Sequence, residues 1–114
     1  MSTTPLRRTR IDHTPTERNA LTVDDGTLGD VLRTLSSETA QAILGTLGEE
    51  PKPVSEISRD VDTSLQNTQY HIERLVDAGL VEAVDVWYSA KGREMSVYAL
   101  TAEELLVEFE SSGT

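Results

Sequence analysis

The stretch SLQNTQYHIERLVDAGL, residues 64–80, constrains the fold more than any other part of the chain. Its apolar side chains repeat at helical spacing, with Thr68 in the one gap: Leu65, Ile72, Leu75, Val76 and Leu80. The other face carries long hydrogen-bonding side chains instead of the Lys and Glu of an ordinary exposed helix: Ser64, Gln66, Asn67, Gln69, Tyr70 and Arg74. Ser64 is a candidate N-cap, and Gly79 can take the left-handed conformation that ends a helix. The stretch therefore predicts an amphipathic helix with an unusual, amide-rich outer face.

Three further helices are predicted before this one. Apolar residues keep the i, i+3, i+4, i+7 spacing over residues 28–35 and again over residues 40–47. Ser36 or Ser37 lies between the two stretches as an N-cap, so they form two helices and not one. Pro53 then starts a short third helix, VSEISRDV, and the turn DTS (residues 62–64) connects it to the next helix.

The period of the apolar pattern changes to two after residue 80, which predicts strands. Val84, Val86 and Tyr88 alternate with Asp85 and Trp87. SAKGRE forms a turn, and MSVYAL returns as the antiparallel partner. Thr101 and Glu104 have the spacing of a capping box, which predicts a last helix with apolar residues at Ala102, Leu105, Leu106 and Phe109. The predicted fold is thus mainly α with a small β-hairpin, in the order H-H-H-H-E-E-H.

The first 23 residues have a different character from the rest. They contain Pro5 and Pro15, four Arg and no apolar periodicity, so residues 1–23 are interpreted as a flexible basic arm and residues 24–114 as the folded domain. Arg7, Arg8 and Arg10 are either part of a disordered tail or a minor-groove arm. The start has no apolar stretch typical of a signal peptide, and no apolar run is long enough to cross a bilayer. A cytoplasmic protein without membrane contact is expected.

The charge distribution adds a second constraint. The formal net charge is -10, but residues 52–93 contain five of the ten cations: Lys52, Arg59, Arg74, Lys91 and Arg93. The acidic excess, with only two Lys and one Phe, is typical of proteins from a salt-rich cytoplasm and favours a halophile-like interpretation. The chain has no Cys and only two His, so no metal site and no cofactor are expected.

A short helix, a tight turn and a longer helix with a polar outer face make a helix-turn-helix, whose second helix fits the DNA major groove. Gln and Asn amides can both donate to and accept from adenine N6 and N7. Cations on the second helix and at the hairpin tip can hold phosphates, which fix the register of the protein on DNA. The residues predicted to bind DNA are Ser64, Gln66, Asn67, Gln69, Tyr70, Arg74, Lys91 and Arg93.

From about Leu32 to Leu100 the chain resembles the winged-helix repressors of the ArsR type. The matching pieces are VSEIS for the first helix of the motif, TQYHIERLVDAGLVE for the recognition helix and GREMSVYAL for the wing. The resemblance implies a winged helix-turn-helix fold and a homodimer that binds operator DNA, with terminal helices in contact between the two copies. Many members sense metals through cysteines that this chain lacks, so the effector ligand is unknown.

The apolar face of the last predicted helix is either part of the core or a dimer seam. We favour the seam, because a small core cannot cover apolar helix faces at both of its ends. The candidate interface residues are Leu28, Val31, Leu105, Leu106 and Phe109.

The leading hypothesis is a homodimeric transcriptional regulator that reads an inverted-repeat operator in double-stranded DNA. The alternative is a winged-helix protein–protein interaction module that binds no DNA, which the strongly acidic surface favours. An enzyme is not expected, because no nucleophile–base pair, glycine-rich phosphate loop or metal-ligand set is present in the sequence.

Overall fold

The computed structural model describes residues 18–22 and 26–109. Within them the helices are α1 (Gly26–Leu35), α2 (Glu38–Leu47), α3 (Val54–Val61) and α4 (Leu65–Asp77). The strands are β1 (Arg18–Thr22), β2 (Lys52–Pro53), β3 (Val81–Tyr88), β4 (Glu94–Leu100) and β5 (Glu104–Glu108). The four predicted helices and the predicted hairpin are confirmed, and so is the mainly α, winged helix-turn-helix fold class.

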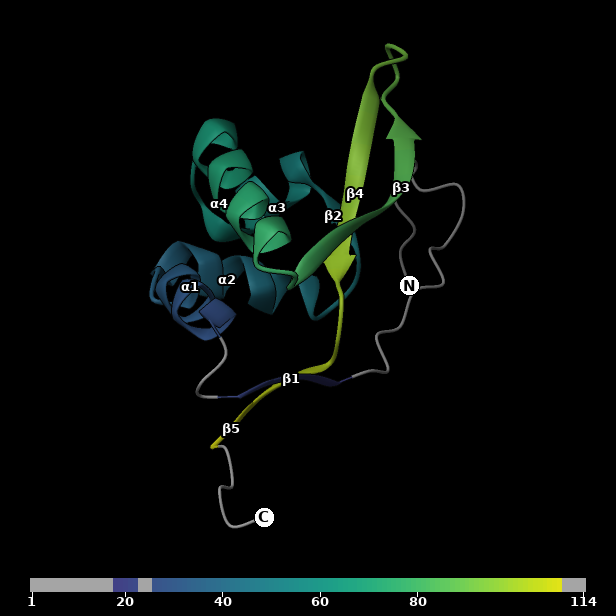
Figure 1. Cartoon of the computed structure of the whole chain (residues 1–114). Coiled ribbons are helices and arrows are strands. Elements are labelled where there is room, and N and C mark those ends of the chain that lie inside the picture. The colour runs from purple at the N-terminus through teal and green to yellow at the C-terminus, as the bar shows by residue number, and fades with distance from the viewer. Residues whose placement is uncertain (1–17, 23–25, 110–114) are drawn as a thin grey trace.

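Three strands form an antiparallel sheet in the order β2-β4-β3. Val81 pairs with Leu100 at the base of the hairpin and Tyr88 pairs with Glu94 near its tip, with a register shift between Ala83 and Asp85. We call β3, β4 and the turn between them (residues 81–100) the wing. Figure 1 shows the wing standing beside the helices and projecting well beyond them.

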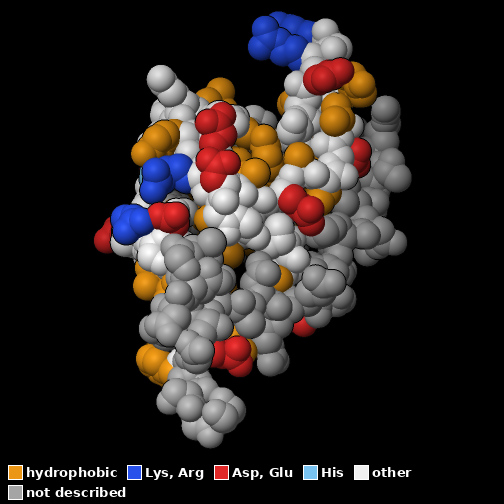
Figure 2. Space-filling view, viewed as in Figure 1, with side chains coloured by type: hydrophobic (Ala, Val, Ile, Leu, Met, Phe, Trp, Pro, Cys, Tyr) orange, Lys and Arg blue, Asp and Glu red, His pale blue; other side chains and the backbone are white. Residues whose placement is uncertain are grey.

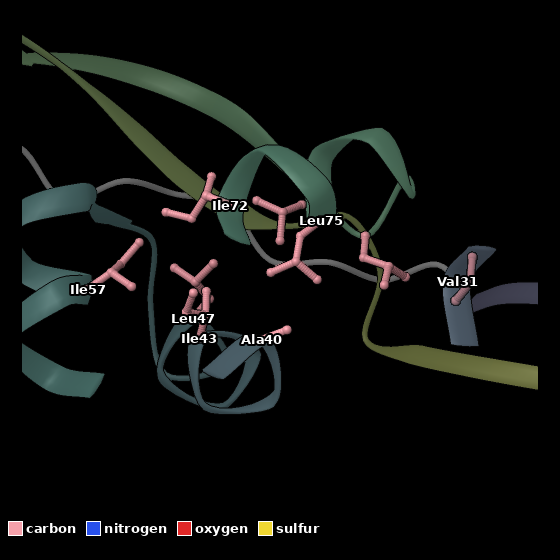
Figure 3. Packing of buried hydrophobic residues seen from close by; sticks show 9 residues of the cluster. Val31, Ala40, Ile43, Leu47, Ile57, Ile72 and Leu75 are labelled. Carbon is pink, nitrogen blue, oxygen red and sulfur yellow. The ribbon is translucent and has the colours of Figure 1, made fainter. Parts of the chain in front are cut away.

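The core lies where α2, α3 and α4 meet, as the close view in Figure 3 shows. Ile43, Ile57, Ile72 and Leu75 are all 0% exposed. Thr68 is equally buried, and its hydroxyl donates to the Ser64 carbonyl at 2.8 Å. This polar side chain therefore fills the gap in the apolar stripe of α4 without leaving its hydroxyl unpaired. The helical spacing read from the sequence therefore identifies the side chains of α4 that pack on the other helices.

The predicted helix ends are also confirmed. Ser37 caps α2 by accepting from the Ala40 backbone N–H at 3.2 Å, and Ser64 caps α4 by accepting from that of Asn67 at 3.0 Å. Gly79 has a φ of 80° and follows the last residues of α4. Its N–H donates to Val76 and that of Leu80 donates to Leu75, each at 2.9 Å, which is the Schellman pattern of a helix C-terminus.

The predicted last helix is wrong. Residues 104–108 form β5, which pairs in parallel with β1 from Arg18↔Glu104 to Thr22↔Glu108. Thr101 does not cap a helix: its hydroxyl donates to the Gly79 carbonyl at 2.8 Å. The backbone partner of β5 comes from a segment more than 80 residues earlier in the chain, which the local spacing of apolar residues cannot reveal.

The arm predicted over residues 1–23 is corrected for one part. Residues 18–22 form β1 and belong to the folded unit, whereas residues 1–17 and 23–25 lie outside the described residues. Of the two terminal helices expected to form a dimer seam, only the first, α1, is a helix. Figure 1 shows β1 and β5 side by side below the helices.

Candidate nucleic-acid interface

The helix-turn-helix consists of α3, a short turn and α4. Asp62 has a φ of 58° directly after α3, a left-handed conformation that Asp tolerates better than most residues. Ser64 then caps α4 at the surface, where its hydroxyl accepts from the backbone N–H of Asn67. The local sequence DTS thereby sets where the N-terminal half of α4 stands relative to the rest of the molecule.

An open groove of about 710 Å³ lies between this half of α4 and the wing. We call it the α4–wing groove, and its lining residues are Pro53, Val54, Ser55, Leu65, Gln66, Gln69, Arg93, Glu94, Met95, Ser96 and Tyr98. Three of the predicted DNA-binding residues, Gln66, Gln69 and Arg93, therefore lie along one groove although the chain separates them by up to 27 positions.

The amides of α4 differ in how they are held. Gln66 is exposed. The Asn67 side-chain N–H donates to the Thr63 hydroxyl at 3.1 Å, and that of Gln69 donates to the Glu73 carboxylate at 3.2 Å. The Gln69 bond is exposed and can be exchanged for a bond to another acceptor, whereas Ser64 and Asn67 stabilise the start of the helix.

Tyr70 and Arg74 form a second group, one turn further along α4. Tyr70 is 55% exposed, and the Arg74 guanidinium carbon lies 5.8 Å from the centre of its ring, within cation–π range. The His71 ring meets that of Tyr70 edge-on, with centroids 5.1 Å apart. Arg74 also lines a small hollow against Asp30 and Arg33 of α1, so it stands apart from the α4–wing groove.

The wing tip presents two cations. Lys91 and Arg93 are exposed, and their backbone N–H groups donate to the Ser89 hydroxyl at 3.2 and 3.1 Å. Gly92 between them has a φ of 80°, which a residue with a Cβ rarely adopts. Figure 2 shows Lys and Arg side chains gathered at the end of the wing, with Asp and Glu over the centre of this face.

Lys52 is not part of the exposed cation group that its position in the sequence indicates. Only 5% of its surface is exposed, and its Nζ donates to the Thr46 hydroxyl at 2.6 Å, to Asp60 at 2.8 Å and to Glu49 at 3.1 Å. Burial alone lowers the pKa of Lys52, but the hydrogen bonds and charges of Asp60 and Glu49 outweigh it and raise the pKa above its ordinary value. The hydrogen bond from Lys52 lowers the pKa of Asp60.

Leu65 is a candidate site residue that the sequence pattern misplaces. The apolar spacing assigns it to the core, yet it is 57% exposed and lines the α4–wing groove beside Gln66 and Gln69. Val76, later in the same stripe, is 40% exposed. The signal that could identify Leu65 is its place directly after the cap Ser64, in the first turn of a recognition helix, where base-reading side chains lie.

The five residues predicted to form a dimer seam differ in exposure. Leu28 and Val31 are buried within the chain, at 7% and 3% exposure. Leu105 is half-buried against the core, whereas Leu106 and Phe109 are exposed, at 36% and 84%. Their part in a dimer stays a prediction.

Among the described residues, no group of three or more His, Cys, Asp or Glu is placed to hold a metal ion. The described helices are also too short or too polar for any of them to cross a membrane.

Residues 35–84 match the model of a helix-turn-helix domain family. This segment runs from the end of α1 into the first strand of the wing. No curated protein is significantly similar to the chain.

Several solved structures share the arrangement. One is the homodimeric winged helix-turn-helix DNA-binding domain of a possible ArsR-family regulator from Mycobacterium bovis, at 21% identity and a TM-score of 0.57, covering 68% of this chain and 66% of that one. An ArsR-like transcriptional regulator from Rhodococcus sp. RHA1 is 34% identical, with a TM-score of 0.54 and coverage of 65% and 64%. The cadmium metal-sensor CMTR from Mycobacterium tuberculosis is 26% identical, with a TM-score of 0.52 and coverage of 67% and 73%. The chain thus spans about two thirds to three quarters of these relatives.

Proposed function

We propose that this chain, an ArsR-like winged helix-turn-helix protein, is a sequence-specific transcriptional regulator that binds double-stranded DNA in the cytoplasm as a homodimer. One observation carries the proposal: the α4–wing groove brings the amides of Gln66 and Gln69 to the same surface as the wing cation Arg93. No enzymatic activity and no cofactor are part of the proposal.

In this proposal the N-terminal half of α4 enters the major groove. Gln66 and Gln69 then meet base edges, where an amide can bond adenine N6 and N7 together. Lys91 and Arg93 at the wing tip, and Arg74 further along α4, contact phosphates and fix the register. Tyr70 holds the Arg74 guanidinium near α4 and so supports its contact with the DNA backbone.

A homodimer would place two copies of α4 in successive major grooves, about 34 Å apart along the DNA, which requires an inverted-repeat operator. The winged helix-turn-helix domain from M. bovis is homodimeric, which supports a homodimer for the present chain. The exposed Leu106 and Phe109 are the apolar side chains with the most surface to offer a second copy among the predicted seam residues.

The test is selection of DNA fragments from a random pool by the purified protein in molar KCl, followed by sequencing. An enriched inverted repeat is expected. Molar KCl is chosen because the net charge of -10 is typical of proteins from a salt-rich cytoplasm. At that salt concentration phosphate neutralisation contributes little affinity, so base contacts should contribute more of it. A steep loss of affinity between low and high KCl would contradict that part of the proposal.

Gln69→Ala then tests the assignment of the base-reading face. It should weaken binding to the selected site by about 1–3 kcal/mol, roughly 5- to 150-fold, while leaving the fold intact. Gln41→Ala is the matched control, because Gln41 is an exposed amide on α2 that bonds the Leu35 carbonyl at 2.7 Å, away from the groove.

A protein-docking module without DNA binding is the second candidate, and the acidic surface favours it. Two results would support docking to another protein instead. One is a folded protein that enriches no DNA, and the other is an affinity for DNA that Gln69→Ala does not change.

A further inference from the structure

Lys52 and Pro53 connect the wing to the helix-turn-helix through their backbone. The two residues form β2, in which Lys52 pairs with Tyr98 and Pro53 with Val97 of β4. Pro53 is at the same time the residue that precedes α3 as its N-cap. One dipeptide is therefore a strand neighbour of the wing and the entry to the first helix of the motif.

The side chain of Lys52 ties this dipeptide to both helices beneath it. Its ammonium group has three hydrogens, and three oxygens accept from it at 3.1 Å or less: Thr46 in the last turn of α2, Glu49 just after it, and Asp60 in the last turn of α3. The Thr46 hydroxyl in turn donates to the same Asp60 carboxylate at 2.8 Å. The ends of α2 and α3 thus share one buried cation.

A cation with 5% exposure is costly to leave without partners, so this arrangement tolerates little displacement. The partners are polar and directional, unlike the Ile and Leu contacts of the core, so they specify one position of β2 relative to α2 and α3. Burial alone would lower the pKa of Lys52, but the hydrogen bonds and charges of Asp60 and Glu49 raise it above its ordinary value, so the ammonium group stays charged throughout the neutral range.

Part of the lining of the α4–wing groove belongs to the same dipeptide or pairs with it. Pro53, Val54 and Tyr98 line the groove, and Tyr98 is the residue that pairs with Lys52. A shift of β2 would therefore move β4 and alter the separation between the wing and α4.

We propose that Lys52 is a positioning residue, which fixes the wing relative to α4 and thereby sets the width of the groove that holds Gln66, Gln69 and Arg93. It contacts no DNA itself. The inference rests on the proposed function only for its consequence in DNA binding, and its structural part can be tested without DNA.

The first experiment measures the geometry. The chain has no native Cys, so nitroxide labels on Asp77→Cys in α4 and Val86→Cys in β3, both exposed positions, report one distance between the helix and the wing. Lys52→Met, which keeps the length of the side chain but not its charge, should broaden or shift the distance distribution. Lys91→Met removes the only other lysine, an exposed one, and should leave the distribution as in the parent. A folded Lys52→Met protein with the parent distribution would overturn the proposal.

The second experiment measures coupling on the selected DNA. The loss of affinity caused by Arg93→Ala should shrink by at least about threefold in the Lys52→Met background, because the wing no longer stands where Arg93 can act. The loss caused by Gln69→Ala should stay the same, since α4 itself keeps its place. A merely destabilising substitution would change both losses alike or neither, and that result would overturn the positioning role.

If Lys52→Met does not fold, Asp60→Asn replaces it in both experiments, because the amide keeps the shape and one acceptor but loses the charge. A parent protein that binds no DNA would overturn the proposed function, and the label distances would still decide the positioning role.

Discussion

The helical body and the terminal strand pair of this molecule are held together by different means. In the body, Ile43, Ile57 and Ile72 have no exposed surface, and three helices meet over them. In the strand pair β1–β5 the connection is a parallel backbone ladder, while Leu106 and Val107 of β5 are 36% and 40% exposed. The contrast teaches that one domain can contain a region built on fully buried side chains next to a strand, β5, that pairs with a distant segment while several of its side chains stay exposed.

The strongest test of this contrast is a cavity in the body. Ile72→Ala should lower the free energy of unfolding by about 2–5 kcal/mol, because the side chain is fully buried between α4 and its neighbours. Urea denaturation at fixed protein concentration measures the change. Val107→Ala in β5 is the control and should cost less than about 1 kcal/mol, since that side chain is partly exposed. Equal losses in the two variants would break the comparison.

A smaller effect is expected from the polar part of the body. Asp60→Ala removes an acceptor from buried Lys52 and should cost about 1–3 kcal/mol at neutral pH. The pKa of Asp60 is lowered in the folded state, so its contribution is present above the ordinary carboxyl pKa and is lost as the pH falls through the folded value. The pKa of Lys52 is raised, so its contribution is lost only in alkali, as the pH rises through a value above 10.5.

Denaturation at a series of pH values checks this assignment. The difference in unfolding free energy between the parent and Asp60→Ala should be largest near neutral pH and should shrink in acid. A difference that is the same at pH 3 and pH 7 would mean that the Asp60 charge contributes nothing.

Leu65 lies at the outer face of the helical body, where its exposed apolar side chain contrasts with the buried ones of the core. We expect it to contact DNA. In the α4–wing groove it stands beside two amides, in a position to meet a thymine methyl group. Leu65→Ala should weaken binding to the selected site by about 1 kcal/mol, a value near the burial of one methyl group.

Replacing thymine by uracil in the operator isolates this contact, because uracil lacks only the methyl group. At the thymine that Leu65 contacts, uracil should weaken DNA binding by the parent protein several-fold and leave DNA binding by Leu65→Ala unchanged. If the loss of affinity from uracil and the loss from Leu65→Ala add in full at every thymine, Leu65 contacts no thymine methyl group.

The smallest effect on stability is expected at the end of the strand pair. Phe109→Ala should change the free energy of unfolding by less than about 0.5 kcal/mol at low protein concentration, because the ring is 84% exposed. If Phe109 belongs to a dimer seam, sedimentation should show weaker self-association in the variant. A variant that self-associates like the parent removes Phe109 from the seam.

The same contrast explains how far the sequence predicts the structure. Ser64, Gly79 and the apolar stripe of α4 act through neighbours within a few positions, so their roles follow from local rules and are confirmed. The strand at residues 104–108 depends on a partner at residues 18–22, and its apolar spacing fits a helix as well as a strand.

The candidate site shows the same division. That Gln66, Gln69 and Arg93 share a groove follows from the order of helix, turn and hairpin. Lys52 is near the exposed cations in the sequence but is buried in the folded protein. The oxygens of Thr46 and Asp60 surround it only after folding, so the sequence does not reveal this. Leu65 obeys the apolar spacing, yet in the first turn of α4 its side chain is 57% exposed, which the spacing alone does not reveal.

The hydrogen bonds at Thr101 close the wing into a loop. Its hydroxyl donates to the Gly79 carbonyl at 2.8 Å and its N–H to that of Leu80 at 3.1 Å, so the chain leaves the body and returns to it at almost one point. Such an excursion can change its length without disturbing what lies below, and each doubling of a flexible loop adds only about 0.6 kcal/mol of closure entropy. The tip at residues 89–93 is therefore an exchangeable module, where inserted or replaced residues could extend the reach of the protein while the helices keep their packing.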